Sequence, residues 1–483
     1  MTISATNGTL SSTGIGSGLD VSSIITQLMA AESQPLTLLQ NAASSINTQI
    51  SAVGQIHSLT SALGDKAQAL ESLDLWKGVT ATSGDSSVVT ADTSAGGASA
   101  GTYQVSVQAL AQAQTVTSAP STGLSAGKLM IELGTYTGSN PATQFDTKPG
   151  TKAIEVDIGD GDTSLASIRD KINAAGAGVQ ATVITDANGS RLSIRSTDTG
   201  AVNGFRITAT ETTDDGSDTT GLSTLGFDAM TTTSPMQLNQ SAGNAKATVN
   251  GITLESATNT FTGVSDGLNL TVSKLSATPV NVTLAQDTTS MTNAINGFVS
   301  AYNSLNAYIH NETKYDAASK TGGPLQGDPS IVGFQYQLRG LVTGTTTASS
   351  TFQRLSDIGI TVQADGSLAA DSTKLAKAMT NVPEVKKLLA NVSDDPGAQG
   401  VMVRFQQLTD NALTTGGRIS SRETGLRAQL QRNSDSQTEM QTRLAATQQR
   451  YQTQFQALDT TMAKMTALST YMTQQITLMQ NSG

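Results

Sequence analysis

The sequence predicts an α+β fold, in which N- and C-terminal helices form a coiled-coil or helical-bundle leg and two mainly antiparallel β-domains are inserted. Apolar residues recur at helical spacing from Asp20 to Trp76 and again after Asp287. Between these stretches the apolar pattern changes to a period of two, which is typical of strands. The order helical, β, helical indicates that the two helical parts belong together and that the middle is an insertion.

The N-terminal part predicts a long helix after a polar start. Residues up to about 18 are rich in Ser, Thr and Gly, and we expect them to be disordered or extended. Asp20 is of a residue type that caps helices, and Leu28 lies on the apolar stripe that follows it. The stripe continues to Trp76, and we expect interruptions of the helix near Pro35 and Gly54.

The middle part predicts short strands and one short helix. Asn250-Gly251 is a strong signal for a two-residue hairpin turn. The helix is expected at Leu165–Ala174. The expected strands are Val88-Val89, Tyr103–Val107, Leu129–Leu133, Ala153–Ile158, Gln180–Ile184, Leu192–Ser196, Phe205–Ala209, Ala247–Val249, Gly251–Leu254, Leu268–Val272 and Val280–Leu284.

Helices resume after Asp287, with apolar faces at 291–309 and 331–341. Leu355–Val362 is strand-like and precedes a turn at Asp365-Gly366, and Val385–Leu389 is helical. The arginines 418, 422, 427 and 432 then predict the solvated edge of a long final helix.

The final helix carries an apolar heptad stripe that extends to Met479. Its members lie seven apart or four residues after a member of that series: Leu444, Tyr451, Phe455, Leu458, Met462, Met465, Met472, Ile476 and Met479. From Leu426 to Met479 the segment exceeds the usual length of a helix in a domain, which favours a coiled coil. The stripe cannot be buried by its own helix, so it needs a helix from earlier in the chain or from another copy. The N-terminal helix is the obvious candidate.

The pattern predicts four structural parts, three of which are built from two separate segments. Residues 1–45 and 440–483 form the terminal helical or disordered leg, and residues 46–78 and 287–439 form a helical-bundle domain. Residues 79–118 and 242–286 form an inner β-domain, into which an outer β-rich domain, residues 119–241, is inserted.

Composition excludes several classes of protein. The chain has no cysteine, which excludes a zinc-thiolate or cysteine redox role, and its net charge of −10 disfavours binding to nucleic acid or to anionic membranes. No apolar run reaches the length of a membrane-spanning helix, so no membrane insertion is expected. The N-terminus lacks the basic and apolar regions of a cleaved signal peptide.

The sequence offers no convergent catalytic or metal-binding constellation, so we expect no enzyme activity and no cofactor. The two histidines, His57 and His310, have no accompanying nucleophile motif. Asp157, Asp160 and Asp162 resemble a calcium loop but lack the EF-hand spacing and its closing glutamate, which favours a polar turn.

An N-terminal block contains Gly16, Gly18, Leu19, Asp20, Leu28 and Pro35. It resembles the N-terminal block of the flagellar hook-associated protein 2 family, the bacterial flagellar filament caps. Further matches are Gly101–Val107, Asn250–Ile252, Gly323–Leu325 with Gly327-Asp328, Ile358–Ile360 with Asp365-Gly366, and Tyr451, Phe455 and Leu458. Ile168–Asn173, with Gly178-Val179 and Arg191-Leu192, resembles the flagellin IN motif.

The resemblance implies a structural assembly factor. Such a cap sits at the distal filament tip, promotes folding and polymerisation of exported flagellin, and prevents its leakage. The implied partners are further copies of the same chain in a ring, flagellin, hook–filament junction proteins and a flagellar type III export chaperone. The implied location is extracellular, after export without a cleaved signal. The alternative is a surface adhesin that binds host mucin or host cells through its exposed β-domains.

Overall fold

The computed structural model describes residues 20–93, 96–121, 124–138, 141–213, 220–318 and 320–480. The chain divides into two compact units. The helical unit contains the two ends of the chain, up to Ser72 and from Thr288, and the β unit is Leu73–Asp287. The structure confirms the predicted α+β class, with a continuous insertion between two helical parts.

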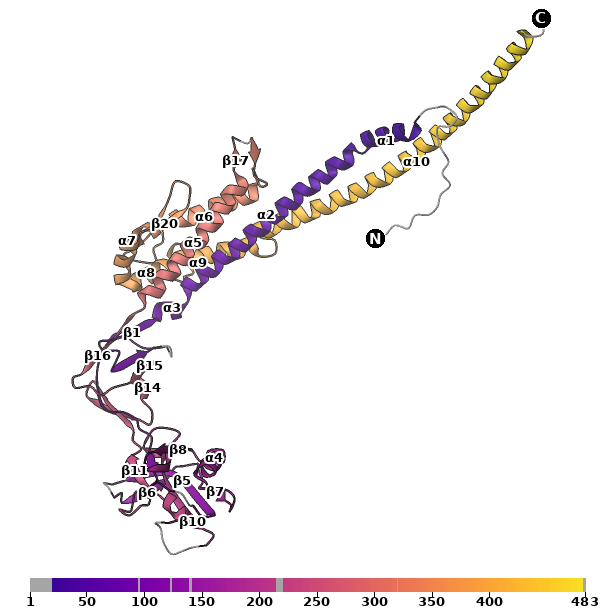
Figure 1. Ribbon diagram of the computed structural model, residues 1–483. Coiled ribbons are helices and arrows are strands. Elements are labelled where there is room, and N and C mark those ends of the chain that lie inside the picture. The colour runs from indigo at the N-terminus through magenta and orange to yellow at the C-terminus, as the bar shows by residue number, and fades with distance from the viewer. Residues whose placement is uncertain are drawn as a thin grey trace. The chain divides into compact units, whose positions relative to one another are not determined.

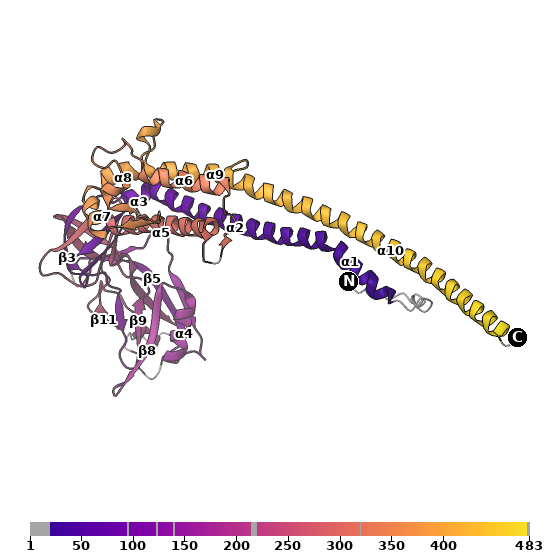
Figure 2. The ribbon, with the colours of Figure 1, turned by 90° about the horizontal axis from the view of Figure 1, so that it is seen from above.

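The helical unit is built around two long helices that lie side by side in both views (Figures 1 and 2). They are α2 (Gln34–Glu71) and α10 (Arg418–Gln480), of 38 and 63 residues, and a shorter α1 (Val21–Glu32) also packs on α10. The final helix therefore begins at Arg418, before the regular apolar pattern that starts at Leu426. The other helices of this unit are α5 (Thr288–Thr313), α6 (Pro329–Thr343), α7 (Ser372–Ala378), α8 (Val382–Ala390) and α9 (Val401–Leu413).

One of the two predicted interruptions of the N-terminal helix is present and the other is not. The break falls at Ser33, and Pro35 occupies the first turn of α2, where its missing N–H costs nothing. The prediction of a break near Gly54 is wrong, because α2 runs through it. Val53 and Ile56 beside it are both fully buried, and that burial outweighs the ~1 kcal/mol by which a glycine disfavours a helix.

Aromatic side chains from three helices hold the bundle at the base of the long pair. Phe298 and Tyr302 of α5, Phe334 of α6 and Phe405 of α9 are fully buried. The rings of Phe298 and Phe405 meet edge to face with centroids 5.0 Å apart.

The predicted strand at Leu355–Val362 is only partly correct. Leu355–Ile358 forms a 3₁₀ turn, and the strand β19 is limited to Ile360–Val362, paired with β20 (Leu368–Ala370). The Asp357 carboxylate accepts hydrogen bonds from the backbone N–H groups of Gln353 and Arg354, at 2.8 and 2.9 Å. Such local bonds favour a turn over a strand.

The β unit contains two separate hydrophobic cores, and each strand pairing among its described residues is antiparallel. The inner core lies between a sheet of order β1-β16-β3-β12-β13 and a sheet of order β14-β15-β2. These strands are β1 (Val79–Ser83), β2 (Val89–Asp92), β3 (Gly101–Ala109), β12 (Ala245–Val249), β13 (Ile252–Ser256), β14 (Thr260–Ser265), β15 (Leu268–Val272) and β16 (Val280–Gln286), preceded by a short helix α3 (Leu73–Lys77).

The outer core combines two further sheets with the helix α4 (Leu165–Ala175), as predicted near 165–174. Its sheets have the orders β10-β5-β6, with β7 also on β5, and β11-β4-β9-β8. The strands are β4 (Thr115–Thr117), β5 (Gly127–Thr137), β6 (Gln144–Thr147), β7 (Ile154–Ile158), β8 (Val179–Asp186), β9 (Gly189–Ser196), β10 (Gly204–Glu211) and β11 (Gln237–Gln240). Val116 packs in this core, whereas the predicted inner segment 79–118 includes it. The four-part division of the chain stays a prediction.

The Asn250-Gly251 turn confirms the hairpin expectation. Both residues have positive φ, 50° and 85°, and they join β12 to β13 with Val249 opposite Ile252. Positive φ at both central positions is the geometry of the tight turn that matches strand twist. Across the described residues, no helix is both long enough and apolar enough to cross a membrane.

Candidate functional site

The paired ends of the chain form the candidate site, and one hydrogen bond marks their register. The Tyr451 hydroxyl of α10 donates to Glu32 Oε1 at the end of α1, at 3.3 Å. These two residues are 419 positions apart in the sequence. The helix that carries the heptad stripe is therefore paired with the N-terminal helices of the same chain.

The structure separates the nine predicted stripe residues into two groups. Leu444, Tyr451 and Phe455 are half-buried on α10, as positions that face α1 and α2 should be. The other six are exposed: Leu458, Met462, Met465, Met472, Ile476 and Met479, with exposed fractions from 37% to 73%. Figures 1 and 2 show α10 continuing beyond α1. A seam along the whole stripe thus stays a prediction, and the described chain covers only its first part.

The N-terminal family residues lie at the start of the same helical pair. Asp20 caps α1, because its carboxylate accepts the backbone N–H of Ser23 at 3.0 Å. Leu28 on α1 is 37% exposed, and Pro35 opens α2. Gly16, Gly18 and Leu19 lie outside the described residues.

A charged anchor fastens α10 to the bundle where the long pair begins. The side chain of Asp328 is only 3% exposed and accepts a hydrogen bond from Arg422 Nε. The same carboxylate caps α6 by accepting the backbone N–H groups of Ser330 and Ile331, at 2.9 and 3.3 Å. From α2, Gln49 Nε2 donates to the Pro324 carbonyl at 3.0 Å. Three helices meet at this loop.

The predicted solvated edge of arginines is wrong for Arg422, which takes part in this anchor. Arg427 does pair with Glu423 on the exposed side of α10. Arg422 instead reaches an almost fully buried carboxylate 94 residues away in the sequence. Sequence reasoning missed this pair, although Asp328 before Pro329 has the signature of a helix N-cap followed by proline at the first helical position.

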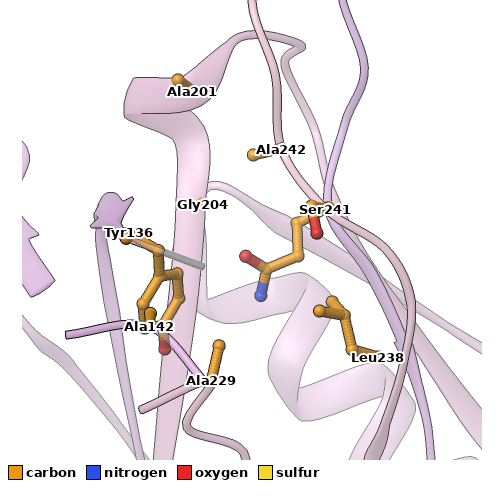
Figure 3. A pocket seen from close by; sticks show the side chains of 10 residues that line it. Tyr136, Ala142, Ala201, Gly204, Ala229, Leu238, Ser241 and Ala242 are labelled. Carbon is orange, nitrogen blue, oxygen red and sulfur yellow. The ribbon is translucent and has the colours of Figure 1, made fainter. Parts of the chain in front are cut away.

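The outer core contains a cavity of about 240 Å³, which Figure 3 shows from close by. Its walls are mainly small or apolar, and Tyr136, Ala229 and Leu238 lie around it. The Tyr136 hydroxyl lies 3.3 Å from Asp228 Oδ1, and burial, with Asp228 nearby, raises the pKa of this phenol. Gln114 is satisfied by the backbone of Phe205, its Nε2 donating to the carbonyl at 2.7 Å. The Gln114 amide and the Tyr136 phenol are thus both hydrogen-bonded within the fold.

Asp157 lies on β7, and Asp160 and Asp162 lie in the segment that turns from β7 into α4. Asp162 accepts hydrogen bonds from Lys171 and Ser167, which hold its pKa below the usual range. Among the described residues there is no group of three or more His, Cys, Asp or Glu side chains that could hold a metal ion.

These features define the class of the protein: a structural protein whose two ends form a long antiparallel helical pair and whose middle is a β insertion. The model of the flagellar hook-associated protein 2 N-terminus matches residues 17–114, and that of its C-terminus matches 242–467. Between them, the flagellin hook IN motif matches residues 137–198.

Curated relatives cover nearly the whole chain. The chain is 33% identical over 489 residues to the flagellar hook-associated protein 2 of Escherichia coli K12, with 98% of this chain and 99% of that protein covered. It is 30% identical over 479 residues to the B-type flagellar hook-associated protein 2 of Pseudomonas aeruginosa, with 94% and 95% covered. The chain belongs to the flagellar hook-associated protein 2 family, and the resemblance seen in the sequence is confirmed.

A solved structure supports the same assignment. The crystal structure of three domains of the Escherichia coli flagellar cap protein matches with a TM-score of 0.55 and 31% sequence identity. The match covers 78% of this chain and 99% of that chain. The family is thus one of structural flagellar cap proteins, and its fold agrees with the one described above.

Proposed function

We propose that this chain is the cap at the distal tip of a flagellar filament, where it promotes folding and polymerisation of exported flagellin and prevents flagellin from leaking away. The full-length relationship to hook-associated protein 2 carries the proposal. The chain acts by binding and shaping its partners. We therefore propose no catalytic step and no cofactor.

The end of α10, which no other described part of the chain covers, supplies the docking surface that such a cap requires. Val21, the first residue of α1, lies 11 residues before Glu32, so the same count along α10 leads from Tyr451 to Met462. Beyond that level, α10 continues to Gln480, which is ~27 Å at 1.5 Å per residue. Leu468, Tyr471 and Leu478 are exposed there in addition to the stripe residues. An apolar surface of this length favours burial against another helix.

The proposed occupants of this surface are helices of the filament end. Burying six stripe side chains contributes roughly 9–18 kcal/mol gross, at ~1.5–3 kcal/mol each, from which the cost of ordering must be subtracted. The proposed partners are other copies of this chain in a ring, flagellin and the hook–filament junction proteins, with a type III export chaperone before assembly. The proposed place of action is extracellular, at the filament tip. The relatives reported above are named as hook-associated or cap proteins and not as adhesins, so mucin binding is not part of the proposal.

Deletion of 451–483 tests the proposal directly. The strain is expected to lose filament growth and to release flagellin monomers into the medium, because the truncated cap lacks its docking surface. Normal filaments in that strain would refute it.

A point substitution separates docking from folding. Leu458→Asp places a charge on the exposed stripe and is expected to weaken retention of the cap at the tip. Thr460→Asp changes an exposed, non-stripe position of the same helix and is the matched control. Both purified variants should keep the circular dichroism of the parent. Equal retention of the Leu458 variant and the parent would contradict a docking role for the stripe.

A further inference from the structure

The helical pair has a break in its apolar interior that the heptad stripe does not reveal. Between residues 427 and 450, six positions of α10 are half-buried and the rest are exposed. These six follow the alternating spacing of three and four residues that a coiled-coil interior has. They are Leu430, Asn433, Gln437, Met440, Leu444 and Thr447. Two consecutive interior positions are therefore occupied by amides.

The two amides are bonded to each other and not across the pair. Gln437 Nε2 donates to Asn433 Oδ1 at 2.6 Å, along one side of α10. In the part of the chain that the structure describes, this is the only side-chain hydrogen bond that either amide makes. A polar interior layer without bonds to the opposite helix stabilises a coiled coil less than an apolar layer does.

The helix that packs on α10 presents an apolar stripe. The buried or half-buried apolar positions in the first part of α2 are Leu36, Leu39, Ala43, Ile46 and Ile50. Both isoleucines lie on the buried stripe of α2, and Ile46 is only 5% exposed.

The two sides of this layer differ in how they are held. Toward the bundle, Leu426 is fully buried and the Arg422–Asp328 pair fastens α10. Away from the bundle, the half-buried positions include the small side chains of Ala43 on α2 and Thr447 on α10, so the interior is thinner there.

We propose that Asn433 and Gln437 form a hinge layer that lets the outer part of the helical pair open without opening the bundle. The outer part comprises α1, the start of α2 and α10 from Met440 onward. This inference depends only on the helical pair and not on the proposed place of action.

Hydrogen–deuterium exchange of the full chain, followed by mass spectrometry, tests the hinge. In the parent protein, amides of residues 440–455 are expected to exchange at least a hundredfold faster than those of 418–432, with the step falling between Asn433 and Met440. The double variant Asn433→Leu, Gln437→Met makes the interior continuously apolar. It is expected to slow exchange at 440–455 at least tenfold and to leave 418–432 unchanged.

The matched control carries the same changes on the outer side of α10. Gln441 and Gln448 are exposed, and Gln441→Leu with Gln448→Met should leave the exchange rates within twofold of the parent. A smooth gradient of exchange along α10, with no step at the layer, would show simple fraying and overturn the hinge. Equal slowing by the two double variants would overturn it as well, because helix propensity and not the layer would then be responsible.

Discussion

Removal of the Asp328 carboxylate is expected to destabilise the helical unit by about 1.5–4 kcal/mol. This side chain makes two kinds of interaction, a helix cap and an ion pair. It caps α6 through the N–H groups of Ser330 and Ile331, and it pairs with Arg422 of α10 while only 3% exposed. Asp328→Ala therefore removes a helix cap and leaves a guanidinium without its partner.

The magnitude follows from the two losses. Replacing an N-cap aspartate by alanine costs ~0.5–2 kcal/mol. Breaking a buried ion pair from one side costs ~3–5 kcal/mol, but the Arg422 side chain is 29% exposed and can turn toward water, so we expect ~1–2 kcal/mol from this loss. Asp328→Asn keeps the cap and loses the charge, and its expected cost is only the second part, ~1–2 kcal/mol.

Urea unfolding of the full chain, followed by far-ultraviolet circular dichroism, measures these differences. Arg427→Ala is the matched control, because it breaks an exposed pair with Glu423 on the same helix, for which ~0.3–0.5 kcal/mol is expected. The expected order of destabilisation is Asp328→Ala, then Asp328→Asn, then Arg427→Ala. If Asp328→Ala costs no more than Arg427→Ala, the carboxylate does not anchor α10 and the reasoning is refuted.

Three further predictions concern other parts of the chain. Burial and the neighbouring Asp410 raise the pKa of Glu71, so its charged form destabilises the fold at neutral pH. Glu71→Gln should raise the free energy of unfolding at pH 7 by roughly 0.5 kcal/mol and remove the stability that the parent gains as the pH falls. An unchanged slope of stability against pH would contradict this. Gly366 has a φ of +81°, and a Cβ at this position would meet the Arg339 guanidinium. Gly366→Ala should therefore destabilise the helical unit by ~1–2 kcal/mol in the urea assay. An unchanged urea midpoint would show that the turn relaxes freely. Replacement of residues 79–286 by a short Gly-Ser linker should leave the helical unit folded, because Val79 pairs with Gln286 and the cut ends are neighbours; loss of helical circular dichroism would refute this.

The sequence predicted which residues line the interior of the helical pair, but it did not predict where the pairing ends. Heptad spacing identified Leu444 and Tyr451 as interior positions, because the period of a helix depends only on local geometry. The same spacing continues through Met472 and Met479, although these side chains are exposed and no helix among the described residues covers them. Periodicity shows which side of a helix is apolar but not how far its partner extends.

Long-range and very short elements escaped prediction for a related reason. Asp328 and Arg422 come together only through the bundle, so no local pattern links them. The strands β4, β6 and β11 have three or four residues each, too few to display an alternation, and their neighbours in the outer sheets hold them in place. The hairpin at Asn250-Gly251 was predictable because its turn chemistry is local.

The pairing of the first and last strands of the β unit explains how helices from opposite ends of the chain can pack against each other. Val79 of β1 lies opposite Gln286 of β16, and the Asp287 N–H donates to the Gly78 carbonyl at 2.9 Å. The chain therefore leaves and returns to the helical unit at neighbouring positions, although 208 residues (79–286) intervene. An insertion closed in this way can change in size without altering the register of α2 against α10. The exposed end of α10 and the inserted β unit are thus free to vary in sequence independently of each other.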